Sequence, residues 1–206
     1  MELNRPLATI TPTLDADVLA LLAQHKVVFT AGQLHRMLSK YSEEGIRKVL
    51  VRLTRQGIVH SERLGNAYGY HLNRHHLAAD PIIALANLQS TLLGRLEDRL
   101  EHWTVPPKYA AVFGSVARGT MTAESDLDLL LVLPDDAPRS IWDDQVEALA
   151  AVVTKWTGND TRPLEYTVGE LAAAHDEPVL HDVLREGLTV AGSRAWLNRQ
   201  MQQRTS

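Results

Sequence analysis

The sequence contains no cysteine and no long apolar run, and both absences exclude classes of protein. Without cysteine the chain has no disulfide and no thiolate metal site, which indicates a cytoplasmic protein. No apolar run approaches the roughly 18 residues that a membrane-spanning helix needs. The N-terminal MELNRPLATITPT also lacks the charged and then apolar layout of a secretory signal peptide. What is present is an ordinary globular composition, 45% hydrophobic and 22% charged, in 206 residues that suffice for one large or two small domains.

The charge is distributed unevenly along the chain. Residues 25–76 contain nine Lys or Arg, three Asp or Glu and six of the nine His, whereas residues 104–206 contain nine Lys or Arg and fifteen Asp or Glu. The first segment is therefore +6 and the second is −6. Such a difference between halves predicts a nucleic-acid-binding front joined to an acidic domain of another kind.

The basic front half, residues 12–76, has the pattern of three helices and a hairpin. Apolar residues recur at helical spacing in 14–26, Thr30 can cap a helix in AGQLHRMLSK, and Ser42 can cap a helix that Gly57 ends. Two short strands, IVHSER and AYGYHLN, flank a Leu-Gly-Asn turn. This order is that of a winged helix-turn-helix domain. The segment resembles winged-helix regulators of the MarR or ArsR kind, and that resemblance implies a dimer bound to a palindromic operator.

The third predicted helix would carry the contacts to DNA. Its Lys and Arg side chains lie outside the apolar face and point outward. A basic helix of this width fits the DNA major groove, where Arg can pair with guanine. The candidate DNA-binding residues are Arg47, Lys48, Arg52 and Arg55 on this helix and Arg63 on the wing. A solvated helix face and a module for protein contacts are the alternative interpretations.

A connecting helix is predicted over residues 80–103. Asp80 can cap it, Pro81 fits its first turn, and apolar residues recur at three- and four-residue spacing as far as Trp103. The apolar stripe either packs on its own domain or forms a dimer interface. Val-Pro-Pro at 105–107 ends the helix and marks a domain boundary.

The acidic back half, residues 104–195, has the pattern of an α/β (α+β) unit with a small mixed sheet flanked by helices. Strands are predicted at 109–113, at the buried run SDLDLLLVL, and at 162–168 and 188–191. Helices are predicted at 140–157, 169–175 and 178–186, with a short helix starting in SVARG after Gly114-Ser115.

Two carboxylates, Asp126 and Asp128, lie at the start of the predicted buried strand. Side chains alternate along a strand, so Asp126 and Asp128 share one face and repel each other unless a cation lies between them. Mg²⁺ rather than a protein cation is the expected neutraliser, because it takes hard oxygen ligands and substrate phosphates. Gly114 permits close backbone approach, Ser115 offers a hydroxyl and an N–H, and Arg118 lies one turn on, so these three residues are candidates for binding phosphate.

The spacing Gly-Ser, ten residues, Asp-x-Asp resembles the nucleotidyltransferase superfamily, which includes DNA polymerase beta, kanamycin nucleotidyltransferase and the minimal nucleotidyltransferases. The resemblance implies two Mg²⁺ ions on Asp126 and Asp128 and an NTP substrate, with ATP favoured. It also implies a third carboxylate on a later strand, as metal ligand or base. Glu165 is the best match, although Asp is commoner at that place.

Two functions follow from these features. The first is a Mg²⁺-dependent nucleotidyltransferase that transfers NMP to a hydroxyl of a protein, a tRNA or another nucleic acid, brought to its target by the winged helix. The resemblance to minimal nucleotidyltransferases adds a relation to toxin–antitoxin modules. With only 38 residues after Val168, the acceptor is expected to be held by the winged helix, a second protomer or another protein. The second is a DNA-binding regulator that senses a nucleotide without turnover. An antibiotic-modifying enzyme is disfavoured because it needs no winged helix.

Overall fold

The computed structural model describes residues 1–202, which divide into two compact units. The N-terminal unit comprises Glu2 and residues 4–89, and the C-terminal unit comprises Met1, Leu3 and residues 90–202. Each unit has its own hydrophobic core. No helix among residues 1–202 is long and apolar enough to cross a membrane.

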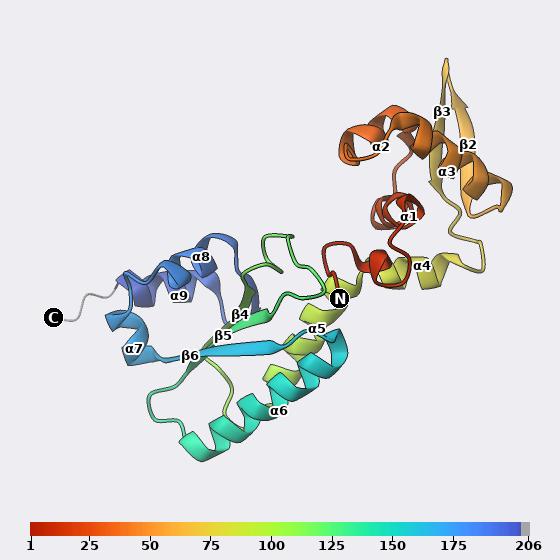
Figure 1. The fold of residues 1–206 in the computed structure, drawn as a ribbon. Helices are drawn as coiled ribbons and strands as arrows, with labels where there is room; N and C mark the ends of the chain where they lie inside the picture. The colour runs from red at the N-terminus through yellow and green to blue at the C-terminus, as the bar shows by residue number, and fades with distance from the viewer. Residues whose placement is uncertain (203–206) are drawn as a thin grey trace. The chain divides into compact units, whose positions relative to one another are not determined.

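The N-terminal unit consists of short helices and a small antiparallel sheet (Figure 1). Its sheet has the order β1-β3-β2, in which β2 and β3 form a hairpin and the two-residue β1 pairs with β3. In chain order the elements are η1 (Pro6–Thr9), α1 (Leu14–Gln24), β1 (Phe29–Thr30), α2 (Ala31–Met37), α3 (Glu43–Arg55), β2 (Val59–Leu64), β3 (Ala67–Leu72) and α4 (Ala79–Ala86).

The caps and the turn predicted for this unit are confirmed. The Thr30 hydroxyl accepts a hydrogen bond from the Gln33 N–H at 3.2 Å, and the Gln33 side chain accepts one from the Thr30 N–H, so α2 begins with a capping box. The Ser42 hydroxyl caps α3 by accepting from the Gly45 N–H at 3.1 Å. Leu64 pairs with Ala67, and the two-residue turn between them holds Gly65 at φ +59°.

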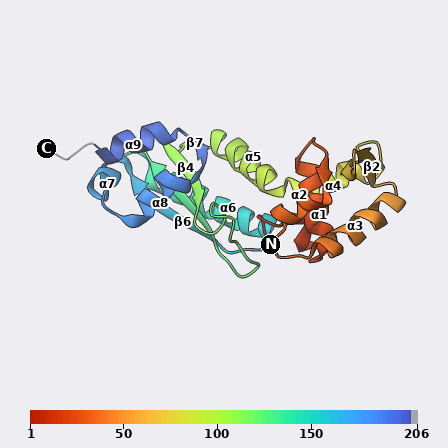
Figure 2. The same cartoon turned by 90° about the horizontal axis from the view of Figure 1, so that it is seen from above.

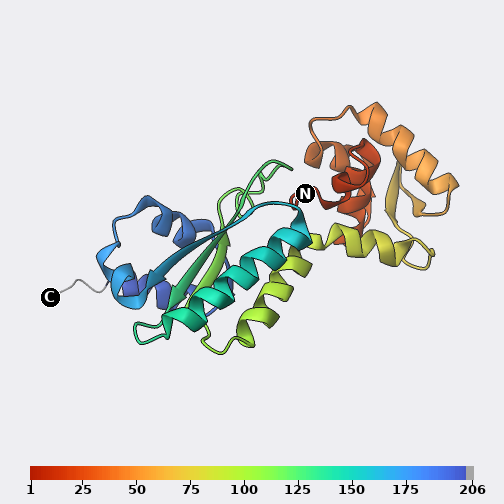
Figure 3. The same cartoon turned by 60° about the horizontal axis from the view of Figure 1, so that its bottom comes forward.

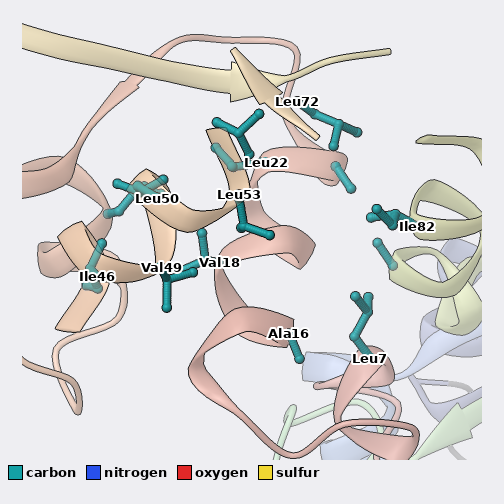
Figure 4. Packing of buried hydrophobic residues seen from close by; sticks show 14 of the residues in the cluster. Leu7, Ala16, Val18, Leu22, Ile46, Val49, Leu50, Leu53, Leu72 and Ile82 are labelled. Carbon is teal, nitrogen blue, oxygen red and sulfur yellow. The ribbon is translucent and has the colours of Figure 1, made fainter. Parts of the chain in front are cut away.

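The core of the N-terminal unit lies under the apolar face of α3. Ile46, Val49, Leu50 and Leu53 are buried at helical spacing and pack in one cluster with side chains of α1, β3 and α4 (Figure 4). The opposite face of α3 is therefore left for polar and charged residues.

The connecting helix is broken, contrary to the prediction of one continuous helix. α4 ends at Ala86 and α5 (Leu88–Glu101) begins two residues later. The cause is Asn87, whose side-chain amide donates to the Ile83 carbonyl at 2.7 Å and so competes with the backbone for a helical acceptor. The start of α4 also differs from the expected cap, because the helix begins at Ala79 and places Asp80 inside the first turn.

The C-terminal unit is a mixed four-stranded sheet with helices, as predicted. Beyond α5 its elements are β4 (Tyr109–Phe113), β5 (Leu127–Leu133), α6 (Arg139–Thr157), β6 (Thr161–Thr167), α7 (Val168–Ala173), α8 (Pro178–Glu186), β7 (Leu188–Ala191) and α9 (Arg194–Gln202). The strand order is β6-β5-β4-β7. β5 is antiparallel to β4 and parallel to β6, and β7 is antiparallel to β4.

Helices cover both faces of this sheet. α5 and α6 lie alongside each other across one face (Figure 3). α7, α8 and α9 group together on the other (Figure 2), where Leu130 and Val132 of β5 share a buried cluster with Leu171, Leu180 and Leu197 of these helices. The run 129–133 is buried because both sides of the strand pack against helices.

α9 was not predicted from the sequence. Of its nine residues only Leu197 and Met201 are buried, and the rest are polar or partly exposed. Two apolar positions four residues apart are too few to indicate an amphipathic helix from the sequence alone.

Candidate active site

Asp126 and Asp128 lie where β5, one of the two inner strands of the sheet, begins. Asp126 immediately precedes β5, and Asp128 pairs with Phe113, the last residue of β4, on one side and with Arg162 of β6 on the other. We call this end of the sheet the acidic edge and define it by Gly114, Asp126, Asp128, Asp160 and Arg162. Alternation along β5 places Asp128 on the same face as Leu130 and Val132, the face that α7, α8 and α9 cover.

Gly114 fits its position for two reasons. Its φ is +68°, in the left-handed region that side chains disfavour. A Cβ at this position would also collide with the Asp128 carboxylate, because that oxygen lies against the Gly114 backbone. The predicted close approach of backbone at Gly114 is therefore present, and its neighbour is the second carboxylate of the motif.

The segment after Gly114 is a series of turns and not the short helix predicted from SVARG. The Arg118 N–H donates to the Gly114 carbonyl at 3.1 Å and the Thr120 N–H donates to the Ser115 carbonyl at 2.9 Å. Gly119, with φ +67°, stops the winding after one turn. Ser115 is half-buried in the first turn, directly after Gly114 of the acidic edge, and its N–H does not open a helix.

Arg118 is exposed, and its side chain is paired with one residue of α8. Its guanidinium donates to the Glu186 carboxylate of α8 at 3.0 Å. Glu186, which no pattern in the sequence indicated, therefore holds the side chain that was predicted to bind phosphate.

The loop that delivers Asp126 is tied down by one buried amide. Asn159 is 2% exposed, and its side-chain N–H₂ donates to the carbonyls of Thr122, Ala123 and Ser125 at 3.2, 3.2 and 2.8 Å. The Leu127 N–H then donates to the Asp160 carbonyl at 2.8 Å. Asn159 was not singled out from the sequence, because its partners lie more than thirty residues away along the chain.

The two carboxylates differ in their surroundings. Arg162 forms an ion pair with Asp126 at 2.8 Å, whereas within residues 1–202 neither a hydrogen bond nor an ion pair within 4 Å reaches the Asp128 carboxylate. Burial raises the pKa of Asp128, the neighbouring Asp126 charge raises this pKa further, and Arg162 and Arg118 act in the opposite direction. A bound cation would therefore stabilise the charge of Asp128 more than that of Asp126, which Arg162 already neutralises.

Arg162 corrects the expectation that no protein cation would offset the acidic pair. Because β5 and β6 are parallel and Asp128 pairs with Arg162, the two side chains project from the same face. Besides its 2.8 Å contact with Asp126, the guanidinium lies 3.5 Å from Asp160. The sequence signal was present as Asp-Thr-Arg at 160–162, opposite Asp-Leu-Asp, but it becomes meaningful only once the strand register is known.

Glu165 does not join the acidic edge, contrary to the prediction of a third carboxylate there. It pairs with Leu131, three residues beyond Asp128, which is about 10 Å along the strand. Its side chain is on the α6 face of the sheet, where it accepts a hydrogen bond from the Trp142 indole at 2.5 Å and lies 3.7 Å from Arg139. Leu131 is three positions beyond Asp128, and this odd offset accounts for the change of face.

The donor set of the acidic edge fits a hard divalent cation, although it is small. Two carboxylates on one face, one of them without a protein partner, supply oxygen ligands of the type that Mg²⁺ prefers. Among residues 1–202 there is no group of three or more His, Asp or Glu side chains placed to hold a metal ion. Any further ligands must come from substrate or solvent.

The candidate DNA-binding cations are all exposed, and three of them have acidic partners. Arg47 pairs with Glu43 at 2.6 Å, Lys48 pairs with Glu44 at 3.5 Å, and Arg52 pairs with Asp15 of α1. Arg63 donates to the Gly65 carbonyl in the hairpin turn at 3.2 Å. Arg55 has no such partner among residues 1–202. The positive charge of this face is therefore smaller than the count of Lys and Arg suggests.

The C-terminal unit has a relation to a known family. Residues 92–188 match the family model of the nucleotidyltransferase domain. This nucleotidyltransferase segment covers just under half of the chain, runs from α5 into β7 and contains the whole acidic edge. The superfamily suggested by the Gly-Ser and Asp-x-Asp spacing is thereby supported for this part of the chain. No curated protein gives a significant match.

Two solved structures are similar to the chain. The first is a toxin–antitoxin with AMP-PNP; it is 16% identical, the match covers 54% of this chain and 82% of that chain, and the TM-score is 0.40. The second is a mutant of the toxin–antitoxin MntA-HpeT, 13% identical, with 54% and 81% covered and a TM-score of 0.39.

We expect Gly114→Ala to be more damaging than Gly119→Ala. Both residues have φ near +68°, so each change costs about 1–2 kcal/mol for the left-handed backbone. Only at Gly114 would the new Cβ displace the Asp128 carboxylate, since no atom lies within 4 Å of a Cβ at Gly119. Urea unfolding of both variants measures the difference. Equal losses of unfolding free energy would show that Gly114 is kept for its φ alone.

We expect Asp128→Asn to stabilise the ligand-free protein at pH 7. The folded state raises the pKa of Asp128 above its ordinary value of 3.8. The protonated carboxyl therefore contributes to the free energy of unfolding, and this contribution is fully present below pH 3.8. This stabilising contribution is lost as the pH rises through the pKa that Asp128 has in the folded protein. Urea unfolding at pH 7 and below pH 4 should therefore show a gain for the variant that disappears in acid. Asp136→Asn, at an exposed position after β5, is the control. A variant less stable than wild type at pH 7 would contradict the expectation.

Proposed function

We propose that the C-terminal unit is a divalent-metal-dependent nucleotidyltransferase that transfers NMP from an NTP, with ATP favoured, to a hydroxyl acceptor. The observation that carries this proposal is the placement of Asp126 and Asp128 on one face beside the Gly114 turn. The match of residues 92–188 to the nucleotidyltransferase domain supports it.

Asp126 and Asp128 are the residues that would hold Mg²⁺, of which the family resemblance implies two ions. When bound, such an ion neutralises charge on the triphosphate and on the developing leaving group. Their shared face and the unpartnered state of Asp128 support this assignment.

The other residues of the site would bind and orient the nucleotide. Arg118, held by Glu186, and the N–H and hydroxyl of Ser115 lie on the turn after Gly114, where they can contact the β- and γ-phosphates. The acceptor oxygen forms a bond to the α-phosphorus, the bond from that phosphorus to its bridging oxygen breaks, and pyrophosphate leaves. With Glu165 on the other face, we assign the acceptor's proton to Asp160, the exposed carboxylate of the acidic edge.

A macromolecular acceptor suits the rim of this site. Arg118, Gly119 and Thr120 are exposed, as are residues 122–124 of the loop that Asn159 holds. The rim is therefore open to a large partner, in keeping with the expected protein, tRNA or other nucleic-acid acceptor. A role within a toxin–antitoxin module and a homodimer are further parts of the proposal, both drawn from the family resemblances.

The N-terminal unit is proposed to be a DNA-binding winged helix. The order α1, α2, α3 and then the β2–β3 hairpin supports this, as does the addition of β1 to the hairpin. The buried face of α3 leaves Arg47, Arg52 and Arg55 exposed on the side that would enter the major groove. Because acids pair with two of these three arginines, DNA must compete with them.

A second candidate function is a regulator that binds a nucleotide without turnover. The specific observation in its favour is that Glu165 is absent from the acidic edge, where Arg162 instead contacts Asp126. A site with two carboxylates and no third one would still bind a nucleotide while transferring it poorly.

Transfer of label from [α-³²P]ATP, with Mg²⁺ and a lysate as source of acceptors, tests the enzyme. We expect Asp126→Asn and Asp128→Asn to lower the transfer by about 10²-fold or more, since each loses a metal ligand. Glu165→Gln should stay within about threefold of wild type, because its carboxylate contacts Trp142 on the other face. Asp136→Asn is the matched surface control. Binding of ATP without transfer by the wild type would favour the sensor instead.

Binding of the chain to duplex DNA at several salt concentrations tests the N-terminal unit. Affinity should fall steeply with salt, and Arg55→Ala and Arg63→Ala should each lower the logarithmic salt slope by about 0.9 if each contacts one phosphate. Glu43→Gln should strengthen binding, because it releases Arg47 from its 2.6 Å pair. If salt and these substitutions have no effect, the unit is a module for protein contacts.

A further inference from the structure

Arg162 occupies the position on β6 from which a third acidic ligand would reach Asp126 and Asp128. It is the β6 residue that pairs with Asp128, and its guanidinium lies 2.8 Å from Asp126 and 3.5 Å from Asp160. On this face the residues of β6 that follow, Leu164 and Tyr166, pack against the buried cluster and offer no carboxylate. The neighbouring strand therefore contributes a cation at the level where the two carboxylates need one.

The charge of Arg162 is permanent. A guanidinium keeps its positive charge in proteins, so the ion pair at 2.8 Å places a fixed cation beside Asp126. The side chain is well exposed and extends over the edge from the start of β6, so solvent and substrate can reach it. By contrast, Arg118, the other cation near the site, is paired with Glu186.

We infer that the Arg162 guanidinium takes the place of one of the two divalent cations, so that the acidic edge binds a single metal ion together with its nucleotide. Asp128, which lacks a protein partner, is the principal ligand of that ion, and Arg162 neutralises Asp126. The inference rests on the proposed nucleotide-binding function and deepens it.

Two physical arguments favour one ion over two. First, a second divalent cation near Asp126 would lie within a few ångströms of a fixed positive charge, and the repulsion rises as the distance falls. Second, within residues 1–202 no third carboxylate is arranged with Asp126 and Asp128 to hold an ion, and Asp160 already faces Arg162. Arg162 is thus a positioning residue: it sets the charge and orientation of Asp126.

Counting Mn²⁺ ions is the direct test. The full chain is saturated with an ATP analogue whose α–β bridge cannot be cleaved, and bound Mn²⁺ per chain is measured by electron paramagnetic resonance and by calorimetry. We expect one ion in the wild type. Arg162→Asp removes the cation and supplies a carboxylate at the same position, so we expect two ions in this variant, with the spin coupling of a close pair. Lys155→Asp, an equal change of charge at an exposed position of α6, the helix on the opposite face of the sheet, should leave the count at one.

Each outcome has a distinct meaning. Two ions in the wild type, or one ion in a folded and nucleotide-binding Arg162→Asp variant, would overturn the inference while leaving the proposed nucleotidyltransferase intact. A wild type that binds no nucleotide in the presence of Mn²⁺ would remove the proposed function itself. If Arg162→Asp fails to fold, the wild-type count decides the question alone.

Discussion

The pairing of β5 with both of its neighbours is the constraint on which the C-terminal unit depends. The antiparallel register with β4 sets Asp128 against the Gly114 backbone, and the parallel register with β6 sets Arg162 beside it. The same registers send Glu165 to the α6 face. A shift of β6 by one residue would move each of these two side chains to the opposite face of the sheet, because alternate residues face opposite sides. The chemistry available at the acidic edge is therefore decided by strand pairing as much as by residue type.

The carboxylates of the acidic edge lie close together, and only one of the two motif carboxylates has a protein cation as a partner among residues 1–202. Arg162 forms an ion pair with Asp126, and Arg118 forms one with Glu186. Asp128 has a raised pKa and no such partner in the described part of the chain. Such an arrangement is unfavourable for the empty protein and favourable for a bound cation, which is the usual relation between stability and function at a binding site. The structure thus separates a carboxylate that the protein neutralises from one that a ligand must neutralise.

Local features could be predicted from the sequence, whereas contacts across the chain could not. The capped helices, the hairpin, the strands and the association of Gly114 with Asp126 and Asp128 follow from spacing and turn chemistry within short segments. Asn159 and Arg162 act through partners set by strand register and loop packing, which periodicity does not report. Asn87 breaks the connecting helix through a side-chain bond to its own backbone, which competes with an otherwise uninterrupted apolar stripe.

The contact between Gly114 and Asp128 also has an evolutionary consequence. Two positions fourteen residues apart share one small volume, since the carboxylate fills the space that a side chain at 114 would need. A substitution at either position changes what the other can tolerate, so the two cannot drift independently. Descendants of this chain that replace the glycine should also have shortened the residue at 128, and with it lost the unpartnered carboxylate.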